Sequence, residues 1–325
     1  MGTYNKADCV MPSETGFGAP QGAFNASPGY RAEKLPAIPH EQVNEIIAPL
    51  LAHISGVVCS TDEKAQYFLA FLAQHVQHPA YKTGVALVLT GDQGVGKDII
   101  LTWYIQYLLG TDAGMQIGKV SHILGGNRGD STALQNKVLC VLDEANFATL
   151  KPYYVDLLKD VITGETLAFN PKNKAAYKMP NVVNLVFTTH TKNPFVLEVP
   201  DSRFVVFDCN GSKKGDYAYF ENLAANLNDK TARAFYQFLL NFDLKDYGCF
   251  KAKRPDTQKY RRQLKDTDLS AFHSFLSYEC IKCAGLAPEP CEPAVLFEKF
   301  KQWAGGANFD FRCYPAIKFL KDEKR

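Results

Sequence analysis

The segment from Gly91 to Asp98, GDQGVGKD, constrains the fold more than any other part of this 325-residue chain. It matches the phosphate-binding pattern G-x-x-x-x-G-K as far as Lys97, but Asp98 stands where the pattern has Ser or Thr. An apolar run (85–90) precedes the segment and a helical stretch (97–110) follows it. Strand, glycine-rich loop and helix in this order predict a nucleotide-binding α/β domain. The alternative is an ordinary glycine-rich turn.

The residue types of this segment suit a bound triphosphate. Glycines permit a tight turn whose successive backbone N–H groups point at phosphate oxygens. Lys97 is expected to add a positive charge at the β and γ phosphates. Asp98 is expected to bind Mg²⁺ directly or through water, although its charge also lies near the phosphates. The nucleotide-binding residues predicted here are Gly91, Gly94, Val95, Gly96, Lys97 and Asp98.

Further apolar runs alternate with amphipathic stretches. Runs at 138–144, 182–189 and 204–208 are typical of strands buried on both faces, and 152–163 is typical of a helix. Buried strands separated by helices predict an α/β fold with a mainly parallel central sheet.

Composition and period divide the chain into four parts. Residues 1–35 are rich in Gly, Pro, Ser and Asn, which is typical of a flexible arm. Residues 36–80 form a helical lead-in, whose second helix is expected to be capped by Thr61 or Asp62. Residues 81–245 form the α/β core. Residues 246–325 begin with a basic run and continue as a C-terminal helical segment.

An acidic pair ends the apolar run 138–144. Asp143 is expected to bind Mg²⁺ and orient its water ligands. Glu144 is expected to act as the general base that activates the attacking water. The alternative is a strand that ends in a solvated acidic pair.

The order and spacing of these motifs resemble the superfamily 3 helicases, compact AAA+-related motors of small viruses, plasmids and phages. The stretch HVQHPAYKTGVALVLTGDQGVGKD is especially similar to the helicase domains of phage and poxvirus-like primase–helicases. The resemblance covers residues 40–245 well and 250–325 loosely. It implies an AAA+-like P-loop NTPase core with a small winged-helix-like appendage, of which 294–304 resembles the opening helix.

The resemblance also assigns a DNA-gripping hairpin. The family carries a Gly-Glu pair and then basic residues after the acidic strand end. Here Gly164 and Glu165 are followed by NPKNK, which places Lys172 and Lys174 at the matching positions. Lysines at a hairpin tip suit the backbone phosphates of single-stranded DNA without base preference. The alternative is a solvated surface loop.

Two more positions follow from the resemblance. His190 stands where the family has a sensor Asn, and Thr189 or Asn193 are alternatives for that role. Arg203 matches the arginine that reaches the nucleotide of a neighbouring subunit. That role requires a ring of subunits. The alternative is a surface ion pair with Asp201.

Composition restricts the class of protein. The chain has 36 Lys and Arg against 34 Asp and Glu, and a local basic excess lies at 251–265, so the overall charge is compatible with DNA. No apolar run is long enough to span a membrane, and the start lacks a secretory signal. The odd number of cysteines favours free thiols in a reducing compartment. We expect an intracellular, soluble protein, in the host cytoplasm or nucleus if viral.

Four cysteines near the C-terminus admit a second interpretation. Their thiolates are zinc ligands in many proteins, but the paired spacing of a four-cysteine site is missing. Buried core cysteines fit better. The four are Cys280, Cys283, Cys291 and Cys313.

These patterns predict an ATP-dependent DNA helicase or translocase of viral or phage genome replication, with Mg²⁺ as cofactor. By resemblance it is a homo-oligomer, a hexamer, that grips single-stranded DNA, unwinds duplex DNA and has a primase or polymerase as partner. One alternative is a replication scaffold or origin-assembly factor that binds nucleotide without turnover, which Asp98 and His190 favour. Another is a P-loop small-molecule kinase, which Arg203 and the segment 164–174 disfavour.

Overall fold

The computed structural model separates into two compact units, Met1–Phe195 with Ser202–Pro255, and Val196–Asp201 with Asp256–Arg325. In the second unit the structure describes one helix, α8 (Pro293–Gly306). None of the helices within the described residues is long and apolar enough to cross a membrane. The described residues are 9–10, 24–25, 29–118, 123, 132–144, 152–170, 175–190, 203–255 and 293–306.

The first unit is built on a five-stranded parallel sheet with the strand order β4-β5-β8-β3-β9. Strand β3 pairs with β8 on one side and β9 on the other. This arrangement confirms the predicted α/β fold with a mainly parallel sheet. The strands are β3 (Ala86–Thr90), β4 (Gly114–Ile117), β5 (Leu139–Leu142), β8 (Asn184–Thr189) and β9 (Phe204–Asp208).

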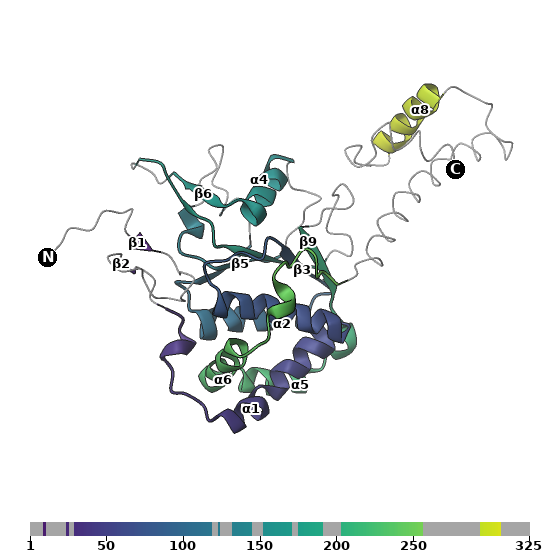
Figure 1. Ribbon diagram of the computed structural model, residues 1–325. Helices are drawn as coiled ribbons and strands as arrows, with labels where there is room; N and C mark the ends of the chain where they lie inside the picture. Colours follow the sequence, from purple (N-terminus) through teal and green to yellow (C-terminus); the bar gives the residue numbers. More distant parts are fainter. Residues whose placement is uncertain are drawn as a thin grey trace. The chain divides into compact units, whose positions relative to one another are not determined.

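Helices cover both faces of the sheet, which explains the continuous apolar runs. Every residue of β3, β5 and β8 is buried, as expected of strands enclosed on both sides. Figure 1 shows α2 next to one face with α1, α5 and α6 beyond it, and α4 with β6 on the other side. These helices are α1 (His40–His53), α2 (Asp62–Gln77), α4 (Pro152–Thr163), α5 (Tyr217–Asn226) and α6 (Asp229–Leu240).

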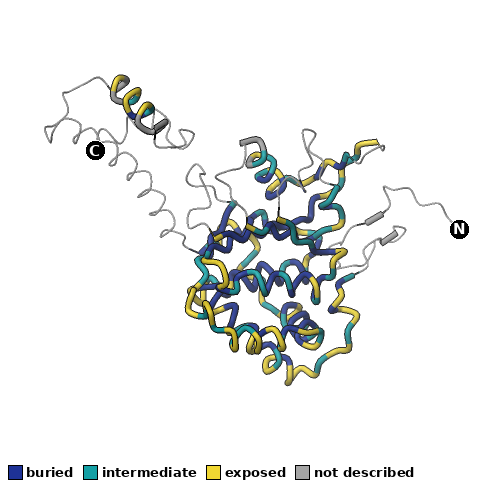
Figure 2. Tube along the Cα trace, turned by 180° about the vertical axis from the view of Figure 1, so that it is seen from behind, coloured by how far each residue is buried: buried dark blue, intermediate teal, exposed yellow. Residues whose placement is uncertain are grey.

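The helical lead-in packs into the same core as the sheet. Thr61 caps α2 as predicted, because its hydroxyl oxygen accepts a hydrogen bond from the Lys64 backbone N at 3.3 Å. Tyr30 and Ala32, which precede the lead-in, are also fully buried. Figure 2 shows this burial as dark blue through the sheet and the helices beside it, with the exposed outer surface in yellow.

The helix after β3 changes its winding part of the way along. It begins as α3 (Ile99–Trp103) and continues as the π-helix η4 (Tyr104–Leu109), which ends at Gly110 with φ 85°. Helix α1 likewise continues as the π-helix η3 (Ile54–Val58). π-Helical turns occur frequently at functional sites, and both of these lie on elements that adjoin the glycine-rich loop.

An antiparallel hairpin follows α4. Its strands β6 (Thr166–Phe169) and β7 (Tyr177–Pro180) pair with each other, and Phe169 stacks on Tyr177 with ring centroids 5.3 Å apart. Lys172 and Lys174 belong to the connection between these strands and lie outside the described residues. The short elements are β1 (Cys9–Val10), β2 (Phe24–Asn25) and the 3-10 turns η2 (Ala32–Lys34), η7 (Thr132–Leu134), η9 (Gly211–Lys213) and η10 (Lys245–Tyr247).

Candidate nucleotide-binding site

The glycine-rich loop follows β3 at the edge where the parallel strands end. The backbone N of Gly91 donates to the Thr189 carbonyl at 3.2 Å, so the loop starts beside the end of β8. After β3 the chain crosses to β4 at the far side of the sheet, and it later returns to β9 on the other side of β3. Ligands of open α/β sheets bind outside the carboxyl ends of strands at such a switch point.

Two glycines of the loop are required for different reasons. Gly94 and Gly96 both have positive φ, 80° and 89°. A Cβ on Gly94 would meet open space, so only the backbone conformation demands glycine there. A Cβ on Gly96 would lie 2.6 Å from Phe220 Cε1 and 2.9 Å from His53 Cε1. The space beside the Gly96 Cα is therefore filled by Phe220 and His53, whereas the space beside the Gly94 Cα is open.

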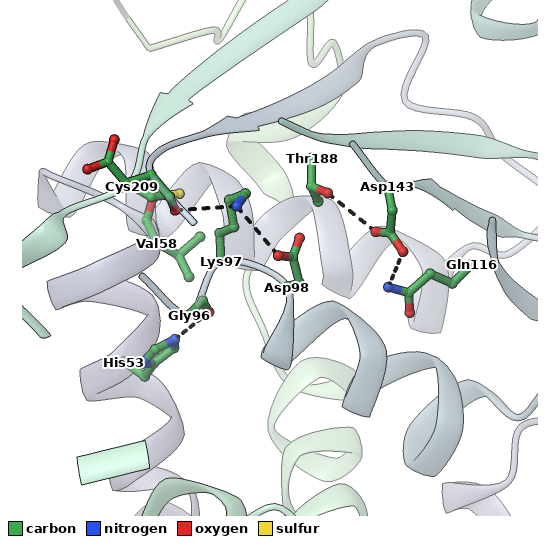
Figure 3. A network of polar contacts seen from close by, with 10 residues as sticks. His53, Val58, Gly96, Lys97, Asp98, Gln116, Asp143, Thr188 and Cys209 are labelled. Carbon is green, nitrogen blue, oxygen red and sulfur yellow. Dashed lines mark hydrogen bonds and ion pairs between the residues drawn. The ribbon is translucent and has the colours of Figure 1, made fainter. Parts of the chain in front are cut away.

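Lys97 is a buried ammonium group whose protein contacts are long. The residue is 6% exposed, and its Nζ lies 3.6 Å from Asp98 Oδ2 (Figure 3). The Asp92 carbonyl oxygen lies 3.5 Å from the same Nζ. Asp98 Oδ1 is buried and has no hydrogen-bond partner among the residues that the structure describes. Buried charges normally have close partners or metal ligation. An anion at Lys97 and a cation at Asp98 fit these two groups.

Asp143 directly follows β5 and lies in a polar network to which four elements contribute. Its Oδ2 accepts from Gln116 Nε2 at 2.7 Å, and its Oδ1 accepts from the Thr188 hydroxyl at 3.3 Å (Figure 3). Gln116 in turn accepts from the Thr102 hydroxyl at 3.0 Å. Burial raises the pKa of the Asp143 carboxyl, with the Asp98 charge adding to the rise and the two hydrogen bonds opposing it. Asp98 and Asp143 thus act on each other electrostatically, as carboxylates at one cation site do.

Gln116 and Thr188 are site residues that the sequence analysis missed. Gln116 lies in β4, a short strand with no apolar run, and pairs in register with Val141 of β5. Thr188 lies within the apolar run of β8. The only sequence signal for either residue is a polar side chain inside or beside a strand.

Glu144 follows Asp143 and is exposed at the end of β5. Its φ of 50° is in the left-handed region, which non-glycine residues seldom adopt. Such backbone strain is concentrated at functional sites, where the surrounding structure maintains it. The outlier marks this position as unusual, and the general-base role of Glu144 stays a prediction.

His190 and Arg203 lie at opposite edges of the sheet. His190 is exposed and directly follows β8, at the same sheet edge as the loop. Arg203 precedes β9, and its carbonyl accepts from the Ala86 backbone N at 2.7 Å, at the start of β3. The length of β3, roughly 16 Å at about 3.3 Å per residue, separates Arg203 from the loop. Arg203 is therefore remote from the loop of its own chain, and its role at the loop of a neighbouring subunit stays a prediction. Asn193 and Asp201 lie outside the described residues.

Helix α1 and the segment before α5 support the loop from behind. His53 at the end of α1 contacts the Gly96 carbonyl oxygen through Nε2 at 3.0 Å. Lys214 pairs with Asp92 at 3.0 Å, which ties the loop to the segment before α5.

Burial raises the pKa of the Cys209 thiol, which packs against Gly91, to about 12 and keeps it neutral. Cys280, Cys283, Cys291 and Cys313 lie outside the described residues, so zinc there stays untested.

Comparison with known proteins places relatives among phage proteins. A model described as a family of unknown function (DUF5906) matches residues 89–203, which include the loop, the acidic pair and Arg203. The DNA Primase-polymerase of Nitratiruptor phage NrS-1 is 27% identical over 180 residues. That alignment covers 54% of this chain and 24% of the phage protein.

Solved structures of the C-terminal region of NrS-1 share the fold. An apo structure of that region matches with a TM-score of 0.57 and 22% identity, over 75% of this chain and 55% of that chain. A second, A-form apo structure matches with a TM-score of 0.56 and 21% identity, over 80% and 59%. This chain therefore spans little more than half of the region that it resembles.

Proposed function

We propose that this chain binds a nucleoside triphosphate with Mg²⁺ at the loop 91–98 and uses its hydrolysis to move along single-stranded DNA in phage genome replication. One observation carries the proposal. The buried Lys97 and the carboxylates of Asp98 and Asp143 lie at one sheet edge, beside a loop with two positive-φ glycines. Such an edge suits a triphosphate and a hard divalent cation.

Each residue has a distinct role in this proposal. The bound triphosphate supplies the phosphoryl group that is transferred to water. The loop N–H groups and Lys97 hold the phosphates, and Asp98 and Asp143 hold Mg²⁺. The Glu144 carboxylate accepts a proton from the attacking water, and His190 contacts the γ-phosphate.

The position of Arg203 supports a ring. Because Arg203 lies at the opposite edge of the sheet from the loop, it serves a nucleotide only if a second copy presents its own loop there. We therefore propose a homo-oligomeric ring, by resemblance a hexamer, with Arg203 acting in trans. We propose the AAA+ and superfamily 3 assignment with this ring, and the parallel α/β core is the observation that supports it.

Two other observations lead us to propose DNA as the substrate. The first is the similarity to a phage DNA Primase-polymerase. The second is the hairpin of β6 and β7, whose connection carries Lys172 and Lys174. We propose that these lysines contact the phosphates of single-stranded DNA, and that a primase or polymerase acts with this chain.

The decisive experiment is ATP hydrolysis with and without single-stranded DNA. The wild type should hydrolyse ATP faster with DNA, and Lys97→Ala and Asp143→Asn should abolish turnover. Lys230→Ala, an exposed lysine on α6, is the matched control and should behave as the wild type. Mixing Arg203→Ala with Lys97→Ala subunits should restore part of the turnover, because each supplies what the other lacks. DNA-independent hydrolysis that Lys97→Ala leaves unchanged would end the proposal.

The Lys97–Asp98 ion pair favours a second candidate, a replication scaffold that binds nucleotide without turnover. At 3.6 Å the Asp98 carboxylate offsets the charge of Lys97 and repels phosphate oxygens. Restoring the usual residue distinguishes the two. If the chain is a scaffold, the wild type binds ATP without hydrolysis and Asp98→Thr gains turnover. If it is a motor, Asp98→Thr changes turnover only modestly.

A further inference from the structure

His53 is a fully buried histidine at the junction of α1 and η3, and both of its ring nitrogens have partners. Nε2 lies 3.0 Å from the Gly96 carbonyl oxygen, and Nδ1 lies 2.8 Å from the Tyr219 hydroxyl. Figure 3 shows His53 below the loop and directed at Gly96. Gly96 directly precedes Lys97, so this histidine holds the peptide that carries the buried lysine.

The chemistry of the two partners determines the tautomer of His53. A carbonyl oxygen only accepts hydrogen bonds, so Nε2 carries the proton and donates it to Gly96. Burial lowers the pKa of His53, and the neutral ring leaves Nδ1 as an acceptor for the Tyr219 O–H. The result is a directed chain from Tyr219 through His53 to Gly96.

Aromatic packing restricts the movement of the His53 ring. The His53 ring stacks on Tyr219 with centroids 5.8 Å apart and meets the edge of Phe220 at 6.3 Å. The same Phe220 and His53 atoms fill the space where a Cβ of Gly96 would be. The Gly96 carbonyl is therefore held by a hydrogen bond, and the space beside the Gly96 Cα is filled by the two rings.

A second buried histidine shows what a histidine without this role looks like. His75 in α2 is 1% exposed, and within the described residues neither ring nitrogen has a hydrogen-bond partner. It packs against Phe71, with ring centroids 4.8 Å apart, as an aromatic core residue does. The two polar partners of His53 set it apart from simple core packing.

We propose that His53 and Tyr219 are positioning residues that hold the Gly96–Lys97 peptide in its phosphate-binding orientation. The inference rests on the proposed nucleotide site and goes beyond it, because neither residue is among the proposed phosphate ligands. Their effect reaches the nucleotide only through the loop. Loss of the two hydrogen bonds that link Tyr219, His53 and Gly96 leaves the loop free to turn the Gly96 carbonyl. Nucleotide binding then weakens.

The test measures the Kd of a non-hydrolysable ATP analogue with Mg²⁺, together with Tm in its absence. His53→Leu should weaken binding about tenfold, since it removes the donor that holds a loop carbonyl. His53→Gln keeps an amide donor near the position of Nε2 and should bind within about threefold of the wild type. Tyr219→Phe should weaken binding about threefold, because the rings still stack. The double variant His53→Leu with Tyr219→Phe should bind no more weakly than His53→Leu, because Tyr219 reaches the loop only through its hydrogen bond to His53.

His75→Leu is the matched control, since it changes another buried histidine away from the loop. It should alter Tm and leave the Kd unchanged. The proposal is overturned if His53→Leu lowers Tm without changing the Kd, or if His53→Gln binds as weakly as His53→Leu. A wild type that binds no analogue overturns the proposed nucleotide site as well, whereas a binding wild type with an equally tight His53→Leu variant overturns this inference alone.

Discussion

The amino ends of the parallel strands form one edge of the central sheet and the carboxyl ends form the other, and buried polar groups are paired more completely at the amino edge. At the amino edge, Asn184 Oδ1 accepts from the Thr83 backbone N at 3.0 Å and from the Thr83 hydroxyl at 2.8 Å. Asn181 Nδ2 donates to the carbonyls of Val161 and Gly164 at 2.8 and 2.9 Å. At the carboxyl edge Lys97 has no described partner nearer than 3.5 Å.

The difference separates stability from binding. Buried polar groups normally have hydrogen-bond partners, and a closed network stabilises the fold. At the carboxyl edge Asp143 is hydrogen-bonded, but Lys97 has only long contacts and Asp98 Oδ1 has no partner within the described residues. A ligand that supplies these missing partners would stabilise this edge. We therefore expect substitutions at the amino edge to change unfolding, and substitutions at the carboxyl edge to change ligand binding.

The largest effect is expected for Lys97→Met. Loss of the ammonium group should reduce nucleotide turnover by about a hundredfold or more, because it removes a positive charge at the phosphates. The free energy of unfolding without nucleotide should stay equal or rise, since a buried charge with long contacts is removed. A turnover assay checks the first expectation, and urea unfolding without nucleotide checks the second. A large loss of stability would show that Lys97 is a structural residue.

Asn184→Ala should show the reverse behaviour. It removes a side chain that accepts twice from Thr83 and donates to the carbonyls of Val138 and Val182 at 3.4 and 3.3 Å. Buried partners are left unsatisfied, so the free energy of unfolding should fall by about 3 kcal/mol. Nucleotide affinity, measured where the variant is folded, should not change. Asn44→Ala, an exposed asparagine on α1, is the control and should be neutral.

Lys82 at the amino edge should make stability depend on pH. Its Nζ donates to the carbonyls of Val161 and Gly164, and burial, with the nearby Lys251 charge, lowers its pKa to about 7. Between pH 7 and the ordinary lysine value near 10.5, the unfolded chain binds the proton more than the folded chain does. Stability should therefore rise with pH in this window, by up to about 1.4 kcal/mol per pH unit.

Lys82→Met is the comparison for that pH series. The variant should unfold with a flatter dependence on pH from 7 to 10, measured by urea denaturation at each pH. Asn181 still donates to the same two carbonyls in the variant, so the edge keeps its partners. Identical slopes in the two proteins would mean that Lys82 stays protonated across this range.

The smallest effect is expected for Gly94→Ala. No atom lies within 4 Å of the added methyl, so the cost is the backbone conformation alone, about 1 kcal/mol. Thermal unfolding should show a slightly lower Tm. A loss much larger than this would mean that the loop is under greater strain at the carboxyl edge than the open space implies.

Much of the core could be predicted from local pattern. The runs at 138–144, 182–189 and 204–208 became β5, β8 and β9, because burial on both faces leaves a continuous apolar signature. β4 gave no such signal, since three of its four residues are only partly buried. Gln116 and the contact that it makes with Asp143 were hidden for the same reason.

Sequence alone determined the buried strands, the glycine-rich loop and the acidic pair at a strand end, because each is a local pattern of residue type and burial. Tertiary structure decided the rest. It placed Gln116 and Thr188 on Asp143, His53 behind Gly96, and Arg203 at the edge away from the loop. These contacts depend on strand order and on helices that meet across long sequence separations, and a one-dimensional period carries no information about either.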